Sequence, residues 1–313
     1  MSVTPAPYGR LTRMREHEVI SSDGTKIRVW RTDADGPVVL LCPGVGSGPE
    51  SWPALLDQAH VISWYMRGTM GSDRPSDETR ITLADHVDDA LATLDDAGID
   101  RCVVLGWSMG VTIAAELARR HPERVSGLML VAGAPGDSFE GMLPLLPSRL
   151  RRSIGLTGTR LLRAAGPVLD SVLHRMPVTD VTSFLLRHSG VIKPSSDPED
   201  VKAAIAPFLR HDWRWYFTLA LALGQAPRQD LSGLRIPVTV LAGKDDVLAT
   251  TESMSEAVGA LPQARFRLLP CSHYLPLEAP QVVADELALL HQRADAVDWA
   301  VSDLFTHVSR DHT

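Results

Sequence analysis

The sequence predicts an α/β protein in which one mostly parallel, doubly wound sheet is interrupted by a helical insertion. Three observations support this fold class. Short apolar runs alternate with amphipathic helical segments through the first third of the chain, the alternation stops between residues 136 and 230, and it resumes from residue 237. We therefore expect an α/β core made of residues 1–135 and 231–313, with residues 136–230 forming a helical cap.

The first part of the chain supplies most of the expected sheet. Two short strands, residues 16–21 and 26–32, are joined by the turn Ser22-Asp23-Gly24. The pattern Thr82-Leu83-Ala84-Asp85 predicts a helix start, and Gly98 predicts the end of that helix. Continuous apolar runs predict strands buried on both faces. These strands are expected at 38–42, 59–64, 102–105 and 125–132, and the helices at 83–94 and 111–120.

The insertion shows no clear strand, and prolines at 144, 147, 167, 177, 194 and 207 divide it into short helices. After it we expect strands at 237–242 and 265–269 and helices at 251–259 and 279–293. Residues 295–313 then predict an extra C-terminal helix, which packs on the body or on a second subunit of a homodimer. Its apolar face would be formed by Val297, Val301, Leu304, Phe305 and Val308.

Composition narrows the class of protein. The net charge of −7 disfavours nucleic acid as a partner, because nucleic-acid binders usually need a basic face. No apolar run is long enough to span a membrane, and the first residues lack the apolar segment of a secretory signal. The cysteines, Cys42, Cys102 and Cys271, form neither a disulfide framework nor a metal motif. We expect a cytoplasmic protein without metal or other cofactor and without stable membrane insertion.

A candidate nucleophile lies in Gly106-Trp107-Ser108-Met109-Gly110, which matches G-x-S-x-G. The motif alone is common, but here it follows the strand 102–105 and opens the helix 111–120. That strand–turn–helix is a nucleophile elbow, in which glycines on both sides relieve crowding around a sharply turned serine. The helix N-terminus beneath Ser108 offers free N–H groups to a developing oxyanion.

With this motif, residues 16 to 293 resemble the α/β-hydrolase superfamily, and within it the capped, esterase- or perhydrolase-like serine hydrolases. The resemblance implies that His273, in the loop 270–278, is the catalytic base. It also implies an acid after the strand 237–242, where the G-x-x-D spacing selects Asp246 over Asp245. Asp137 is a remote alternative, because some members carry the acid after the preceding strand.

The resemblance further implies an oxyanion hole made of the backbone N–H groups of Val45 and Met109. Pro43 replaces the histidine that is usual in Pro43-Gly44-Val45-Gly46, but the donors are backbone groups and do not depend on it. The segment 65–75 is similar to the family's D-x-R-G-x-G-x-S loop, with Tyr65 in place of the aspartate and the second glycine displaced to Gly71. We expect this loop to brace the site.

The cap carries a dense aromatic cluster at residues 213–217. Trp213, Trp215 and Tyr216, together with Trp107 of the motif, are candidate substrate-binding residues. The competing interpretation is packing between cap and body. The leucine- and arginine-rich segment 143–173 is either a solvated face or a surface that touches lipid.

These residues predict a serine hydrolase that cleaves a carboxylic ester or related acyl bond of a small molecule through an acyl-enzyme. Alternatives on the same machinery are a proline iminopeptidase, a carbon–carbon bond hydrolase, a thioesterase and a cofactor-free perhydrolase. A non-catalytic small-ligand-binding protein of the same fold is an alternative of another class.

Overall fold

The computed structural model describes residues 14–136, 138–139 and 146–310. Eight strands form one sheet in the order β1-β2-β4-β3-β5-β6-β7-β8. Strands β1 and β2 pair antiparallel, as do β2 and β4, and every later pairing is parallel. The strands are β1 (Met14–Ile20), β2 (Lys26–Thr32), β3 (Val38–Cys42), β4 (His60–Trp64), β5 (Cys102–Trp107), β6 (Val125–Val131), β7 (Val238–Gly243) and β8 (Ala264–Leu269).

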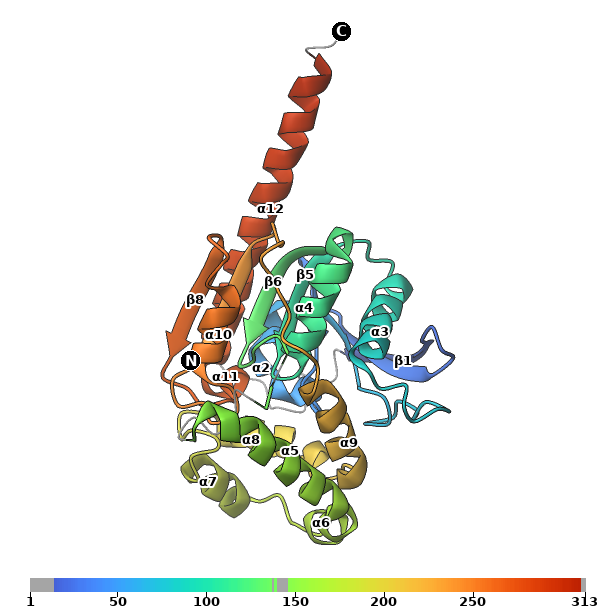
Figure 1. Ribbon diagram of the computed structural model, residues 1–313, viewed down its shortest axis with the longest axis vertical. Coiled ribbons are helices and arrows are strands. Elements are labelled where there is room, and N and C mark those ends of the chain that lie inside the picture. Colours follow the sequence, from blue (N-terminus) through green and yellow to red (C-terminus); the bar gives the residue numbers. More distant parts are fainter. Residues whose placement is uncertain (1–13, 137, 140–145, 311–313) are drawn as a thin grey trace.

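Helices cover both faces of the sheet (Figure 1). Side chains alternate between the two faces along each strand, so Leu40 and Val104 belong to one core whereas Leu41 and Leu105 belong to the other. The first core is closed by α3 (Leu83–Asp96), α4 (Gly110–Arg120) and α10 (Thr251–Val258). The second is closed by α2 (Pro53–Gln58), α11 (Leu275–Glu278) and α12 (Pro280–Arg310). Single 3₁₀ turns occur at Pro49–Ser51 and Pro122–Arg124.

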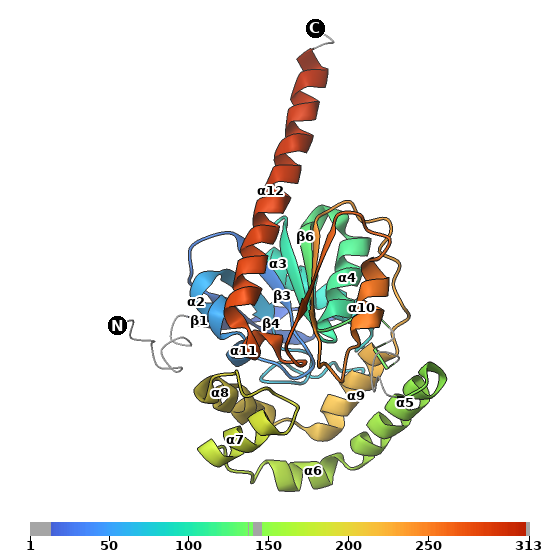
Figure 2. The same ribbon diagram turned by 90° about the vertical axis from the view of Figure 1, so that its left-hand side faces the viewer.

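A cap of helices interrupts the sheet between β6 and β7. It comprises α5 (Ser148–Ala164), α6 (Gly166–Leu173), α7 (Asp180–His188), α8 (Pro198–Phe208) and α9 (Trp213–Gly224). The cap covers the end of the sheet opposite to that from which α12 projects (Figures 1 and 2). This places it over the carboxyl ends of the parallel strands, where open α/β sheets bind their ligands.

The C-terminal helix differs from the prediction of two separate helices. Helix α12 runs unbroken from Pro280 to Arg310, because no glycine or further proline interrupts that stretch. Its distal part projects away from the body (Figure 2), and Trp299 is 71% exposed. Of the predicted apolar face, only the side chain of Val297 lies within the described part of the chain. No helix among the described residues is long and apolar enough to cross a membrane.

Candidate active site

Ser108 occupies a sharp turn between β5 and α4, with a backbone φ of 55°. Its N–H donates to the Val131 carbonyl at 2.9 Å, which ties the turn to β6. A Cβ on Gly106 would lie 2.6 Å from the Gly110 carbonyl oxygen, and a Cβ on Gly110 would lie 2.1 Å from that of Cys42. Both glycines are therefore required by close backbone approach, as the motif predicts.

Three side chains from separate loops form a linear hydrogen-bonded chain. The Oγ of Ser108 lies 2.8 Å from Nε2 of His273, and Nδ1 of His273 lies 2.9 Å from Oδ2 of Asp246. A carboxylate at Nδ1 fixes the tautomer in which Nδ1 carries the proton and Nε2 accepts from Ser108. The sequence analysis predicts that these three residues act together. The fold brings them into contact although 165 positions separate Ser108 from His273.

The two adjacent aspartates after β7 have different surroundings. Asp246 is only 5% exposed, and its Oδ1 accepts from the N–H groups of Leu248 and Ala249 at 2.8 and 2.9 Å. Asp245 is exposed and forms an ion pair with the ammonium of Lys193 in the cap. Only Asp246 faces the imidazole. Asp137, the remote alternative, lies outside the described residues.

The loop that carries His273 is held from two sides. Nε1 of Trp107 donates to the His273 carbonyl at 3.2 Å, and the two rings lie 5.9 Å apart. The buried carboxylate of Glu278 accepts from the Ser272 N–H at 2.7 Å and from the Lys193 N–H at 2.8 Å. The cap loop at Lys193 is thus anchored to the loop of the candidate base, a link that no sequence motif indicated.

The predicted oxyanion donors lie beside the candidate nucleophile. Val45 and Met109 both line the cavity above Ser108, and neither backbone N–H donates to another described residue. A Cβ on Gly44 would lie 3.5 Å from the Cβ of Ser108, so the loop backbone approaches the serine closely. Two free amides in such a position can bind a developing negative charge.

His211 was not expected to contribute to the site, yet it contacts the oxyanion loop. Its Nε2 lies 2.8 Å from the Gly46 carbonyl oxygen, and the side chain is buried. Burial lowers the pKa of His211, which favours the neutral ring, and the nitrogen at the carbonyl must then carry the proton. Gly46 has φ +68°, and a Cβ there would lie 2.6 Å from this ring nitrogen.

A cavity of about 850 Å³ lies between the cap and the sheet, with Ser108 and His273 in its wall. Its described lining includes no Asp, Glu, Lys or Arg. Most of the wall is aliphatic or aromatic, as in ligand pockets for apolar molecules, and the cap helices and the loops between them supply many of these side chains. These apolar residues include Leu162, Leu173, Met176, Leu185, Ile192, Ile205, Phe208 and Phe217.

The four candidate substrate-binding aromatics divide into two pairs. Trp107 and Tyr216 line the cavity, whereas Trp213 and Trp215 are absent from its lining. Trp215 instead fastens the cap: its Nε1 donates to the Arg67 carbonyl at 2.7 Å, and the Arg74 guanidinium lies 4.4 Å from its ring centroid. Trp213 packs behind the wall against Tyr216 and Phe217. For Trp213 and Trp215 the structure matches the packing interpretation rather than direct substrate contact.

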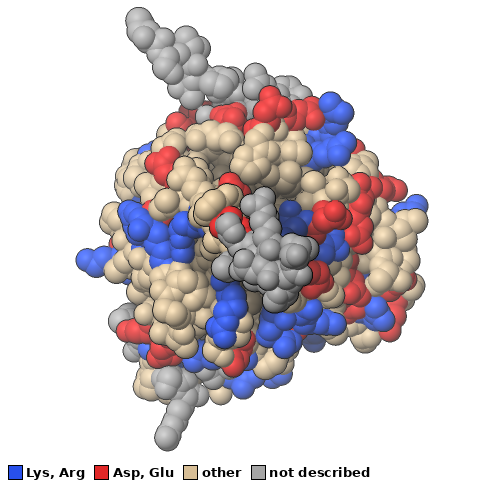
Figure 3. Space-filling model, turned by 90° about the horizontal axis from the view of Figure 1, so that it is seen from above, with Lys and Arg blue, Asp and Glu red and all other residues tan. Residues whose placement is uncertain are grey.

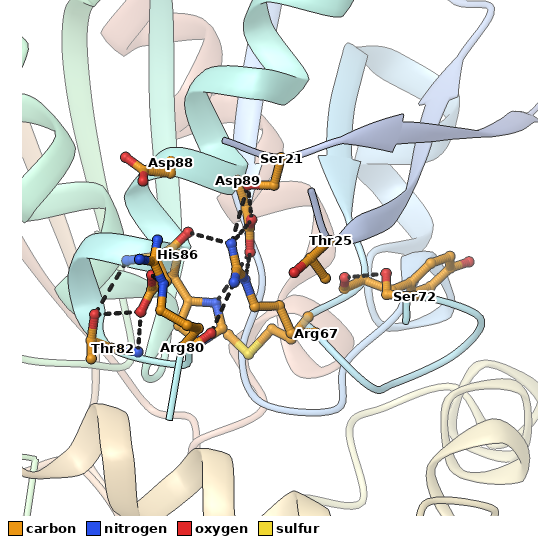
Figure 4. A network of polar contacts seen from close by, with 12 residues as sticks. Ser21, Thr25, Arg67, Ser72, Arg80, Thr82, His86, Asp88 and Asp89 are labelled. Atoms are coloured by element: carbon orange, nitrogen blue, oxygen red, sulfur yellow. Dashed lines mark hydrogen bonds and ion pairs between the residues drawn. The ribbon is translucent and has the colours of Figure 1, made fainter. Parts of the chain in front are cut away.

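The loop 65–75 is braced by a buried ion-pair network (Figure 4). Arg67 is fully buried, and its guanidinium donates to both carboxylate oxygens of Asp89 at 2.8 and 2.7 Å. It also pairs with Asp23 at 2.5 Å. Because the Arg67 carbonyl accepts from Nε1 of Trp215, this network also stabilises the part of the loop 65–75 that contacts the cap.

The described part of the chain shows neither a reactive cysteine nor a metal site that could serve as an alternative active site. Burial raises the pKa of Cys102 to about 12 and that of Cys271 to about 11, which keeps both thiols protonated. No group of three His, Cys, Asp or Glu side chains among the described residues is arranged to hold a metal ion.

The sheet order, the serine elbow and the cap define the architecture of an α/β hydrolase, and comparison with known proteins agrees. Residues 37–162 match the family model for the alpha/beta hydrolase fold. The chain is 28% identical over 235 residues to a putative carbamate hydrolase RutD from Azorhizobium caulinodans, covering 74% of this chain and 81% of that protein. The chain has the α/β-hydrolase fold and is similar to members of that superfamily.

Solved structures show the same fold. A hydrolase from Pseudomonas aeruginosa aligns with a TM-score of 0.64 at 22% identity, covering 88% of this chain and 98% of that one. A thermophilic esterase from Thermogutta terrifontis aligns with a TM-score of 0.60 at 20% identity, covering 90% and 99%.

Proposed function

We propose that the protein is a serine hydrolase that cleaves carboxylic esters with an apolar acyl group. The observation that carries the proposal is the hydrogen-bonded chain Ser108–His273–Asp246 at the wall of the cavity. Apart from His273, the described lining of that cavity contains no residue that carries a formal charge. Similarity to hydrolases of this fold supports hydrolytic chemistry, but the fold alone does not fix the substrate.

In the proposed mechanism, Oγ of Ser108 attacks the ester carbonyl while Nε2 of His273 removes its proton. Asp246 stabilises the imidazolium and holds its orientation. The N–H groups of Val45 and Met109 bind the oxyanion of the tetrahedral intermediate. The imidazolium then protonates the departing alcohol, which leaves an acyl-enzyme. Water, activated by His273, attacks this acyl-enzyme and releases the carboxylic acid and the free serine.

The cavity favours an ester over a carbamate as substrate, although similar relatives are named putative carbamate hydrolases. A free carbamate is small and anionic. The described lining offers a carbamate anion no Lys or Arg. Its leucine, isoleucine and phenylalanine side chains would not compensate the anion for the loss of water. An aliphatic acyl chain would instead gain about 0.8 kcal/mol for each methylene that it buries.

The same observations weigh against a proline iminopeptidase, because the described lining has no carboxylate to bind a free amine. Thioester, carbon–carbon bond and perhydrolase chemistry use the same groups and remain alternatives that substrate tests separate. As part of the proposal we place the protein in the cytoplasm, because its three cysteines are free and buried.

A series of p-nitrophenyl esters of increasing acyl length tests the proposal, with a p-nitrophenyl carbamate and an anilide as comparators. We expect kcat/KM to rise about fourfold for each added methylene until the cavity is filled. A preference for the carbamate, or equal rates on all chain lengths, would contradict an apolar acyl site. Binding of the esters without any turnover would indicate the non-catalytic alternative.

A further inference from the structure

The outer surface of the cap carries exposed apolar side chains in regular stripes. On α5 they are spaced by four and seven positions, on α6 by four and on α7 by three, so each helix presents one apolar face. We call this set the outer cap face, and none of its members lines the cavity. It comprises Leu150, Ile154, Leu161, Val168, Val172, Val181 and Phe184, whose exposed fractions run from 42% to 67%.

Helix α6 lies at the end of the cap farthest from the sheet, and α5 runs obliquely toward it from near the body (Figures 1 and 2). Soluble monomers rarely gather so many large apolar side chains on one surface. Elsewhere exposed large apolar side chains are dispersed, for example Ile20 on β1 and Trp299 on α12. The opposite end of the molecule instead shows Lys, Arg, Asp and Glu side by side (Figure 3).

The charge beside α5 and α6 is positive, whereas beside α7 Lys202 is shared by Asp180 and Glu199. Arg160, Arg163 and Arg175 are exposed, and no described carboxylate forms an ion pair with them. The only carboxylates on α5, α6 and α7 are Asp170 and Asp180, and both are engaged. Asp170 accepts from the Trp213 N–H at 2.9 Å, and Asp180 pairs with Lys202 at 2.5 Å. Apolar stripes flanked by arginines are typical of helices that lie on anionic lipid.

The outer cap face is also continuous with the cavity. Four apolar side chains of the cap line the cavity and are themselves 37% to 62% exposed, namely Leu162, Met176, Leu185 and Val191. Leu162 on α5 and Leu185 on α7 directly follow Leu161 and Phe184 in the sequence, whereas Met176 and Val191 lie in the segments after α6 and α7. An acyl chain that left a lipid layer at this face would pass over apolar side chains until it reached the cavity.

We propose that the outer cap face docks on an anionic lipid surface, and that the lipid-soluble esters held there are the substrates of the cavity. Docking requires only the cap. The delivery of substrate rests on the proposed esterase function, so the two parts are measured separately.

Docking is tested by sedimentation of the full-length chain with vesicles of phosphatidylcholine alone or mixed with phosphatidylglycerol. We expect binding to the mixed vesicles that weakens at least fivefold when the salt is raised from about 0.1 M to about 0.5 M. The double variant Leu161→Asp/Phe184→Asp should lose binding at least tenfold. Ile20→Asp, which changes an equally exposed apolar residue on β1, is the matched control and should bind like the wild type.

Each variant is also assayed on a short, soluble p-nitrophenyl ester and on a long-chain ester dispersed in the mixed vesicles. The double variant should keep the soluble rate within twofold, which shows that it folds, and lose most of the vesicle rate. Absent binding of the wild type, or unchanged binding of the double variant, would overturn the docking proposal. A wild-type dimer that the double variant dissociates would assign the face to a second copy instead. Vesicle binding without hydrolysis of either ester would leave docking standing and refute the esterase proposal.

Discussion

His211, at the entrance to α9, lies with its Nε2 2.8 Å from the carbonyl oxygen of Gly46, in the loop that also carries the Val45 amide. The cap therefore contacts the proposed oxyanion hole directly, through a residue that touches neither Ser108 nor Asp246. A change in the cap at this point should alter the position of the proposed donor, because the Gly46 carbonyl is only two peptide units along the loop from the Val45 N–H.

The variant His211→Phe should lower kcat on a soluble ester about tenfold with little change in KM. Complete loss of an oxyanion donor costs about 10²–10³ in kcat, and a displaced donor should cost less. His211→Gln, whose amide can donate to the same carbonyl, should restore most of the rate. Trp215→Phe is the control, because it removes another cap–body hydrogen bond without touching the oxyanion loop. Equal losses in His211→Phe and Trp215→Phe would argue for a merely structural role of His211.

Asp246→Asn should reduce kcat by up to ~10⁴, because an amide stabilises the wrong imidazole tautomer. Asp245→Asn should stay within about tenfold of the wild type, since Asp245 faces Lys193 of the cap. Steady-state rates of both variants on the same activated ester decide between them. The assignment of Asp246 fails if the larger loss belongs to Asp245→Asn, and near-normal rates in both variants would redirect attention to Asp137.

Arg67→Met should destabilise the fold by about 3–5 kcal/mol, because it leaves the buried carboxylate of Asp89 and the carboxylate of Asp23 without their shared cation. Urea unfolding followed by circular dichroism measures the loss. Arg80→Met is a matched control, since the Arg80 side chain is 44% exposed. A loss below about 1 kcal/mol in Arg67→Met would show that the network contributes little to stability.

His86 predicts a pH dependence of stability. It is fully buried, neither ring nitrogen has a hydrogen-bond partner among the residues that the structure describes, and burial lowers its pKa to about 4. In the unfolded chain a histidine titrates near ~6.5, so between these values the unfolded state binds more protons and stability falls as the pH falls. His86→Leu should reduce the loss of unfolding free energy between pH 6.5 and 4 by about 2–3 kcal/mol. An unchanged pH dependence would contradict the buried, neutral state.

Much of the sheet could be predicted from the sequence because buried parallel strands appear as uninterrupted apolar runs. The strands 26–32 and 38–42 have the predicted bounds, and the elbow at Ser108 lies where the strand and helix patterns meet. Two short helices, α2 and α11, were missed. Each has six residues or fewer, which is too short to display a helical period.

The contacts between cap and body could not be predicted, because no pattern in the sequence specifies how an inserted helix sits on a sheet. His211 appeared as one histidine before an aromatic cluster, and nothing linked it to Gly46. For the same reason the sequence analysis includes Trp215 among the candidate substrate-binding residues, although its Nε1 donates to the Arg67 carbonyl and so links the cap to the body. By contrast, Asp246 and His273 were predictable because the spacing after each strand end resembles that of the family.

The central claim is that Ser108 is the nucleophile, and covalent labelling tests it most directly. A fluorophosphonate should modify the wild type once, at Ser108 as located by peptide mass spectrometry, and abolish ester turnover in proportion. Ser108→Ala should remain folded by circular dichroism, take up no label and retain only the residual rate that binding and the oxyanion hole provide. Labelling or near-wild-type turnover in Ser108→Ala, or modification of another cavity serine such as Ser47 or Ser253, would contradict the account.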